Sequence, residues 1–113
     1  MDYLRYIVND IHTVVAATTD DNGLPVTCAI DIMDCDEKGL YFLTAKGKGF
    51  YNRLSKEKYI ALTGIKGSNT MSSVAISVRG TVKEIGTERL SDLFEKNPYM
   101  EQIYPTEESR KAL

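Results

Sequence analysis

Apolar and polar residues alternate along much of this chain, a pattern typical of strands that bury one face. The clearest alternation spans residues 74–83, where one face carries Val74, Ile76, Val78 and Val82. Gly80 interrupts this face, and a glycine inside a strand favours a bulge or a barrel corner. Runs of β-branched and aromatic residues predict four further strands, at residues 12–19, 26–34, 40–44 and 59–65.

Helical spacing of apolar residues occurs at the start of the chain and again in its middle. Residues 2–11 begin with Asp2, which can cap the first turn, and predict a short amphipathic helix. Four apolar side chains share one face, namely Leu4, Ile7, Val8 and Ile11. Phe50 and Leu54 lie one helical turn apart and predict a short helix over residues 47–57.

The last quarter of the chain predicts two short helices. One begins near Leu90 and must end near Pro98, and Thr106 caps a final helical turn. Between them lies an apolar patch, for which we expect packing in the core or in a dimer; it comprises Tyr99, Met100, Ile103, Tyr104 and Pro105.

Short turns join the first three predicted strands. Asn22-Gly23 suits one hairpin, and residues 36–39 form the second turn, so the three strands form an antiparallel meander. Five such strands with few helices predict a mainly β fold, a closed or nearly closed barrel that two or three helices plug or flank. A length of 113 residues fits a single domain, residues 1–113.

Composition narrows the class of protein. With 42% hydrophobic and 27% charged residues, the chain reads as an ordinary soluble domain. No apolar run approaches ~18 residues and no basic segment opens the chain, so we expect no membrane span, no signal peptide and a cytoplasmic location. Cys28 and Cys35 lie seven residues apart on one predicted strand, so we expect free thiols on opposite faces. One histidine in the chain predicts no metal site of the usual zinc type.

Charge is unevenly distributed, although the net charge is only −2. Residues 38–83 carry nine basic side chains and one acidic one, whereas residues 1–37 carry eight acidic and one basic. The densest basic stretch, residues 46–58, is either the solvated face of a helix or a site for a small anion such as a phosphate. A pI near 5.4 argues against nucleic acid as a partner.

The junction between the third strand and the next helix is the strongest candidate for that anion site. After Thr44 it contains Lys46, Gly47, Lys48 and Gly49. An anion here would meet backbone amides, the helix dipole and two ammonium groups, and the glycines would let the backbone approach it closely. The alternative is a flexible connection with no ligand. The Walker pattern of phosphate-binding loops is absent.

Four stretches carry a likeness to a known family: residues 17–25 (ATTDDNGLP), 39–48 (GLYFLTAKGK), 61–64 (ALTG) and 78–82 (VRGTV). In order and spacing they resemble the pyridoxamine 5'-phosphate oxidase-related FMN-binding split barrels, over roughly residues 12–85. The resemblance implies an antiparallel, Greek-key-like split β-barrel of six strands. It also implies a homodimer with one FMN in each of two sites at the subunit interface.

The resemblance further implies which residues contact FMN. The strand beside the flavin ring would comprise Thr27, Cys28, Ala29 and Ile30. The ribityl chain and phosphate would lie near Phe42, Leu43 and Thr44. The phosphate itself would be held by Lys46 and Lys48 beside Gly49. The following helix would contact the cofactor through Tyr51 and Asn52.

The sequence also departs from the oxidases that name the family. Those enzymes carry an Arg at the start of the second-strand motif and a Ser-Arg-Lys after the third strand, where this chain has Thr27 and Lys46-Gly47-Lys48. They also carry a late strand with substrate-binding Arg and His residues, whereas this chain stops at Leu113. We therefore expect a barrel short of a strand, by nature or by truncation, and a substrate other than vitamin B6.

The leading functional hypothesis is an FMN-dependent oxidoreductase of an unidentified small molecule, in which the flavin supplies the redox chemistry. The alternative is a non-catalytic carrier or sensor of the same fold that holds FMN or haem. No catalytic residue stands out. His12 is either a proton donor to a flavin, a haem ligand or a plain boundary residue at the start of a strand. Asp31 and Arg79 lie on the polar faces of predicted strands. They either form an ion pair, which we expect, or Arg79 faces an anionic partner.

Overall fold

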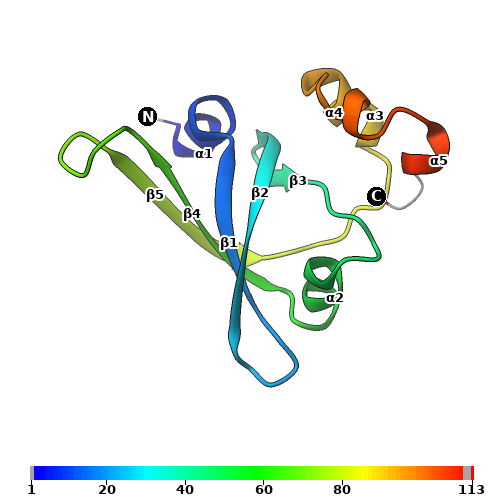
Figure 1. Ribbon diagram of the computed structural model, residues 1–113, viewed down its shortest axis with the longest axis horizontal. Helices are drawn as coiled ribbons and strands as arrows, with labels where there is room; N and C mark the ends of the chain where they lie inside the picture. The colour runs from blue at the N-terminus through cyan, green and yellow to red at the C-terminus, as the bar shows by residue number, and fades with distance from the viewer. Residues whose placement is uncertain (1, 111–112) are drawn as a thin grey trace.

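Five antiparallel strands form a single curled sheet, with helices at its ends and along one side (Figure 1). The computed structural model describes residues 2–110 and residue 113. The strands are β1 (Thr13–Thr19), β2 (Pro25–Asp36), β3 (Gly39–Phe42), β4 (Tyr59–Lys66) and β5 (Val74–Thr81). Their order in the sheet is β3-β2-β1-β4-β5. The fourth strand returns to lie beside the first, which is the Greek-key order.

The sheet is a half-barrel. β3 and β5 are its two edges, and within the described part of the chain no ladder joins them. β3 is four residues long, because its pairing with β2 ends at Phe42. The antiparallel split-barrel fold with flanking helices is confirmed, as is the meander, but the sheet has five strands rather than the six that the resemblance implied.

The helices are short and lie close to where the sequence predicts them. They are α1 (Tyr3–Tyr6), the π-helix η1 (Ile7–Ile11), α2 (Gly49–Lys56), α3 (Leu90–Lys96), α4 (Met100–Ile103) and α5 (Glu107–Arg110). The Asp2 carboxylate caps α1 by accepting from the Arg5 amide at 3.0 Å. The single turn of α4 was not predicted. None of the described helices has the length and apolar character that a membrane crossing requires.

Two apolar cores lie on opposite faces of the sheet where β2 pairs with β3. The inner core lies under η1 and α2 and contains Ile7, Val14, Ile32, Phe50 and Leu54. The outer core lies under α3 and α4 and contains Met33, Leu93, Phe94 and Met100. Successive residues from Leu40 to Leu43 pack against the two cores in turn, with Leu40 and Phe42 in the inner core and Tyr41 and Leu43 in the outer core.

Glycines in the sheet act differently from the prediction. Gly80 lies in an unbroken β4–β5 ladder opposite Ile60, so the bulge or corner expected there is wrong. Gly64 is the glycine that packing requires, because a Cβ at this position would lie 2.7 Å from the Ile11 Cγ2 atom. The backbone of β4 thus lies directly against η1.

The bulge lies in β2 instead. The β2–β3 register shifts between Ile32 and Asp34, which gives Met33 no partner on β3. The extra residue reverses the alternation, so Cys28 and Cys35 both pack against the inner core. The prediction of opposite faces is therefore wrong, whereas the prediction of free thiols is confirmed.

Beyond the bulge, Asp34 is a buried carboxylate surrounded by three cations. Its side chain is 3% exposed and lies 2.8 Å from Lys96 Nζ, 3.3 Å from Arg5 Nη1 and 3.4 Å from Arg89 Nη2. Burial alone would raise the pKa of this carboxyl. Hydrogen bonds from Lys96, the Cys35 backbone and Arg5 outweigh burial, so the pKa of Asp34 lies below its ordinary value.

We expect Asp34→Asn to lower the free energy of unfolding at pH 7 by about 3 kcal/mol, because it leaves three cations facing a neutral group. Asp21→Asn is the matched control, since Asp21 forms an exposed pair with Lys56 at 2.9 Å and its loss should cost under about 1 kcal/mol. Urea denaturation of the three proteins measures both values. Equal stability of parent and Asp34→Asn would contradict the prediction.

The same pair of proteins tests the pKa direction. A carboxyl with a depressed pKa in the folded state contributes stability that is complete above its unfolded pKa and is lost as pH falls through the folded pKa. The stability difference between parent and Asp34→Asn should therefore be constant near neutrality and shrink below about pH 4.

Candidate functional site

The strand that the sequence places beside a ligand has a free backbone edge. β3 pairs with β2 only over residues 32–36 of β2, whereas β1 pairs with residues 25–31 on the other side. Residues 27–30 of β2 therefore lack a strand partner on the β3 side within the described chain. Backbone N–H and C=O groups at such an edge are available to a planar ligand with a polar rim.

Side chains of the same four residues divide between the two faces of the sheet. Thr27 and Ala29 are exposed on the outer face, and Cys28 and Ile30 are half-buried against the inner core. A ligand at this edge would thus contact backbone atoms and small side chains, since two of the four predicted residues are core residues.

The junction predicted to hold an anion is directly connected to this edge. β3 ends at Phe42, where its pairing with β2 also ends, and α2 begins at Gly49. Lys46 and Lys48 are exposed between them. The first helical hydrogen bond runs from the Asn52 amide to the Lys48 carbonyl at 3.2 Å, and no side chain caps this end of α2. The amides that precede this bond therefore point at the junction without a helical acceptor.

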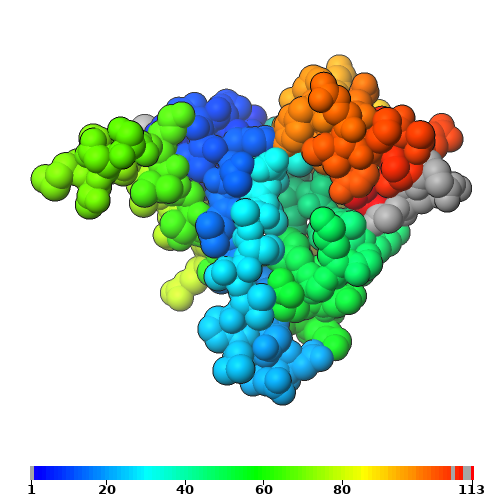
Figure 2. Space-filling model, in the orientation of Figure 1, coloured from blue at the N-terminus to red at the C-terminus, as the bar shows by residue number. Residues whose placement is uncertain are grey.

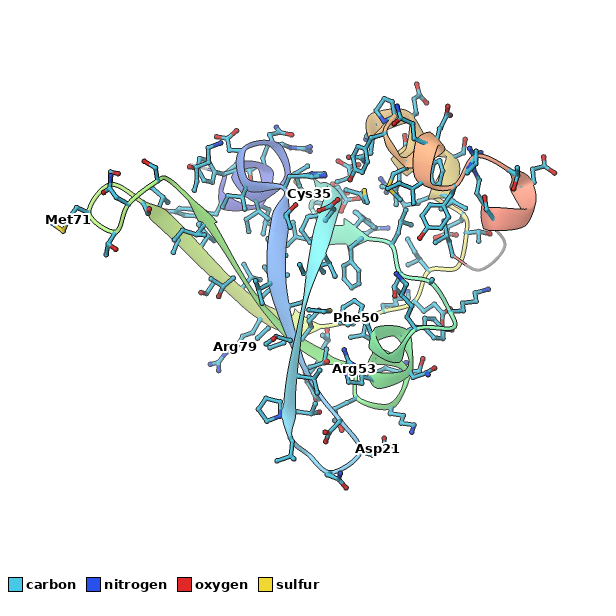
Figure 3. The ribbon with its side chains drawn as sticks, in the orientation of Figure 1. Asp21, Cys35, Phe50, Arg53, Met71 and Arg79 are labelled. Atoms are coloured by element: carbon cyan, nitrogen blue, oxygen red, sulfur yellow. The ribbon has the colours of Figure 1, made fainter. Side chains whose placement is uncertain are left out.

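A third cation lies at the junction. A Cβ on Gly49 would lie 3.1 Å from Arg53 Nη1, which places this guanidinium beside the start of α2. Arg53 is held there by donating from Nε to the Thr18 hydroxyl at 2.7 Å and by packing on the Phe50 ring. Figure 3 shows Phe50 and Arg53 pointing from α2 toward β1 and β2. Arg53 is not among the residues predicted to form the site, although its position four residues after Gly49 is a usable signal.

The other residues predicted to contact FMN lie on either side of the junction in the sequence. Phe42 packs in the inner core, with its ring centroid 5.8 Å from that of Phe50, and Leu43 packs against the outer core. Thr44 is half-buried, and Asn52 is exposed. The Tyr51 hydroxyl donates to Glu84 at 2.9 Å, and this bond raises the pKa of Tyr51.

A separate polar cluster joins the helices to the sheet. His12 Nε2 lies 2.8 Å from the Tyr99 hydroxyl, which donates to Asp31 at 2.9 Å. Burial and this bond to Asp31 raise the pKa of Tyr99. His12 has a φ of 66°, so its backbone is in the left-handed region that non-glycine residues rarely adopt. Through Tyr99, which precedes α4, these contacts hold α4 to Asp31 of β2.

The ion pair expected between Asp31 and Arg79 is wrong. Asp31 lies on β2 and accepts instead from Tyr99 and from the Thr13 hydroxyl. Arg79 lies on β5, with β1 and β4 between the two strands. Across residues 2–110 and 113, no three His, Cys, Asp or Glu side chains come together as metal ligands.

Comparison with known proteins gives the family of this fold. A sequence model described as pyridoxamine 5'-phosphate oxidase matches residues 1–113. No curated protein sequence matches the chain significantly.

Solved structures share the fold at low sequence identity. The protein Atu2129, of unknown function, from Agrobacterium tumefaciens str. C58 has a TM-score of 0.76 at 16% identity, covering 91% of this chain and 47% of its own. An F420 reductase has a TM-score of 0.66 at 18% identity, covering 87% and 79%. The heme storage protein HutZ from Vibrio cholerae has a TM-score of 0.63 at 12% identity, covering 90% and 73%. The chain thus spans about half the length of the Agrobacterium protein.

Proposed function

Because this chain belongs to the pyridoxamine 5'-phosphate oxidase family, we propose that it binds FMN and is an oxidoreductase of a small molecule. The observation that carries the proposal is the pairing of a free backbone edge at residues 27–30 with a basic junction at residues 44–49. FMN has the matching chemistry, a planar ring with polar edge atoms at one end and a phosphate at the other.

The residues present fit this group. The phosphate would be held by Lys46 and Lys48, with Arg53 and the free amides of α2 completing the contact. The flavin ring would lie along the edge of β2, between the Thr27 and Ala29 positions and the chain after Phe42. Bound FMN supplies one- and two-electron transfer. The protein's own part is to anchor the phosphate and orient the ring.

The substrate of the proposed reaction differs from pyridoxamine phosphate. The Arg that opens the second-strand motif of those oxidases is replaced by Thr27, and their Ser-Arg-Lys by Lys46-Gly47-Lys48. A phosphate on the substrate would also compete with FMN for the lysines of the junction. The proposal is therefore a reductase or oxidase of another small molecule.

Haem carriage is the alternative, because the fold is similar to that of the heme storage protein HutZ. His12 is the one histidine in the chain and so the natural iron ligand. Its Nε2 atom, however, is engaged at 2.8 Å by the Tyr99 hydroxyl. Ligation through Nε2 would break that contact, which favours FMN over haem.

We propose that the protein is a homodimer whose second copy covers the half of the outer face nearest η1. Val15 and Ile65 lie on this face and are 51% and 64% exposed. Their neighbours in this half of the face are small, including Ala29 and Ala75. A flat apolar face of this kind suits a self-complementary contact around a two-fold axis.

The absorbance spectrum of the protein purified without added cofactor tests the proposal. We expect the yellow flavin bands, and their bleaching by a reduced nicotinamide would support an oxidoreductase. A Soret band in their place would favour the haem alternative and contradict the proposal.

Lys48→Glu should weaken FMN binding by about 100-fold, because it replaces an attraction to the phosphate with a repulsion. Riboflavin lacks the phosphate and should bind parent and variant alike. Lys38→Glu, in the turn between β2 and β3, is the control and should leave FMN affinity nearly unchanged. Flavin fluorescence titration measures all three. Unchanged FMN affinity in Lys48→Glu would place the phosphate elsewhere.

Ile65→Lys should convert the proposed dimer to a monomer, because it buries a charge in the contact. Light scattering should give about twice the chain mass of 12.7 kDa for the parent and the chain mass for the variant. Met71→Lys is the control, since Met71 is 94% exposed at the tip of the β4–β5 hairpin (Figure 3). This hairpin protrudes from the body of the molecule (Figure 2). A monomeric parent at micromolar concentration would refute the dimer.

A further inference from the structure

Two hairpins of the sheet are held together by a short ladder. β1 and β2 share seven residue pairs and β4 and β5 share eight, but only three pairs join β1 to β4. The last of these is Ala17 with Ala61. Beyond it the hairpins separate, and a hollow of about 830 Å³ opens between them, here termed the hairpin cleft. This volume is in the range of small-molecule sites.

The lining of the hairpin cleft combines an unpaired cation with an exposed aromatic ring. Arg79 lies across the ladder from Ala61, whose small side chain leaves the guanidinium uncovered. Among the described residues, no carboxylate lies within ion-pair distance of Arg79. Figure 3 shows it extending from β5 on the side away from α2. Tyr59, also in the lining, is 66% exposed.

The spacing of these two groups suggests the shape of a ligand. Tyr59 is two residues from Ala61, so it is a diagonal neighbour of Arg79 on the same face, about 7 Å away. Glu57, the acidic residue in the lining, lies two positions before Tyr59 and repels negative charge at that end of the cleft. Negative charge on a ligand is therefore favoured only at the Arg79 end. Ala17 and Ala61 form a flat floor between them.

We propose that the hairpin cleft binds a planar aromatic carboxylate, with its ring on Tyr59 and its carboxylate on Arg79. The guanidinium presents a planar pair of N–H donors that matches a carboxylate. The tyrosine face and the alanine floor remove the ring from water. The site is separate from the basic junction, which lies beside α2.

The position of the cleft gives this ligand a role if the function proposed above holds. Thr27, Ala17, Ala61 and Arg79 form one row across four strands, so Arg79 lies three strand spacings, ~14 Å, from Thr27. A bicyclic acid anchored on Arg79 would extend toward the edge where the flavin ring is proposed. We infer on that basis that the substrate class is aromatic acids.

Titration calorimetry with 2-naphthoate tests the binding step directly. The parent should bind 2-naphthoate at least about tenfold more tightly than 2-naphthamide, which has the same ring without the charge. Arg79→Gln should abolish that difference, and Arg79→Lys should retain part of it. Lys66→Gln removes a positive charge from the same hairpin outside the cleft and should change the affinity by less than about twofold.

Three results would overturn the proposal. They are equal 2-naphthoate affinity in parent and Arg79→Gln, no binding by the parent at millimolar concentration, and a change of oligomer mass on Arg79→Gln, which would place the cleft itself inside the contact between copies. Flavin content is measured on the same samples by visible absorbance. Binding of 2-naphthoate without flavin would keep the cleft and refute the oxidoreductase, and the reverse result would refute only the cleft.

Discussion

The bulge at Met33 is the constraint on which the rest of the structure depends. Because of one extra residue in β2, Cys35 returns to the inner core that contains Ile32, and Asp34 takes a buried position beside Lys96. The bulge also sets where β3 pairs with β2, and thus where the chain leaves the sheet after Phe42. The open edge at residues 27–30 and the basic junction are both consequences of that exit.

Local patterns predicted most of the fold, because alternation and turn residues are encoded in neighbouring positions. The strand boundaries, to within two residues, and the Asp2 and Thr106 caps were predicted for this reason. The bulge was not, because a strict period of two assigns every residue after it to the wrong face. The glycine signal at Gly80 pointed to the wrong strand, and the requirement for Gly64 depends on contact with η1, which lies far away in sequence.

Only part of the candidate site was predicted, because only part of it lies on neighbouring positions of the sequence. Lys46, Lys48 and Gly49 lie on one short segment, so their proximity follows from the sequence. Arg53 reaches the junction by bonding Thr18, and Tyr99 reaches His12 across 87 positions, which no local pattern contains. Phe42 and Leu43 were assigned to the ligand, but their alternation makes them core residues that hold the junction in place.

The three cations on Asp34 come from opposite ends of the chain. Arg5 belongs to α1, whereas Arg89 and Lys96 belong to the segment around α3. If the segment around α3 opened by itself, Asp34 would lose its ion pairs with Arg89 and Lys96 while still buried. The free energy of opening this segment alone is therefore raised. α1 and α3 are thereby coupled to the end of β2, and we expect amide hydrogens in both helices to exchange through a shared opening rather than by independent fraying.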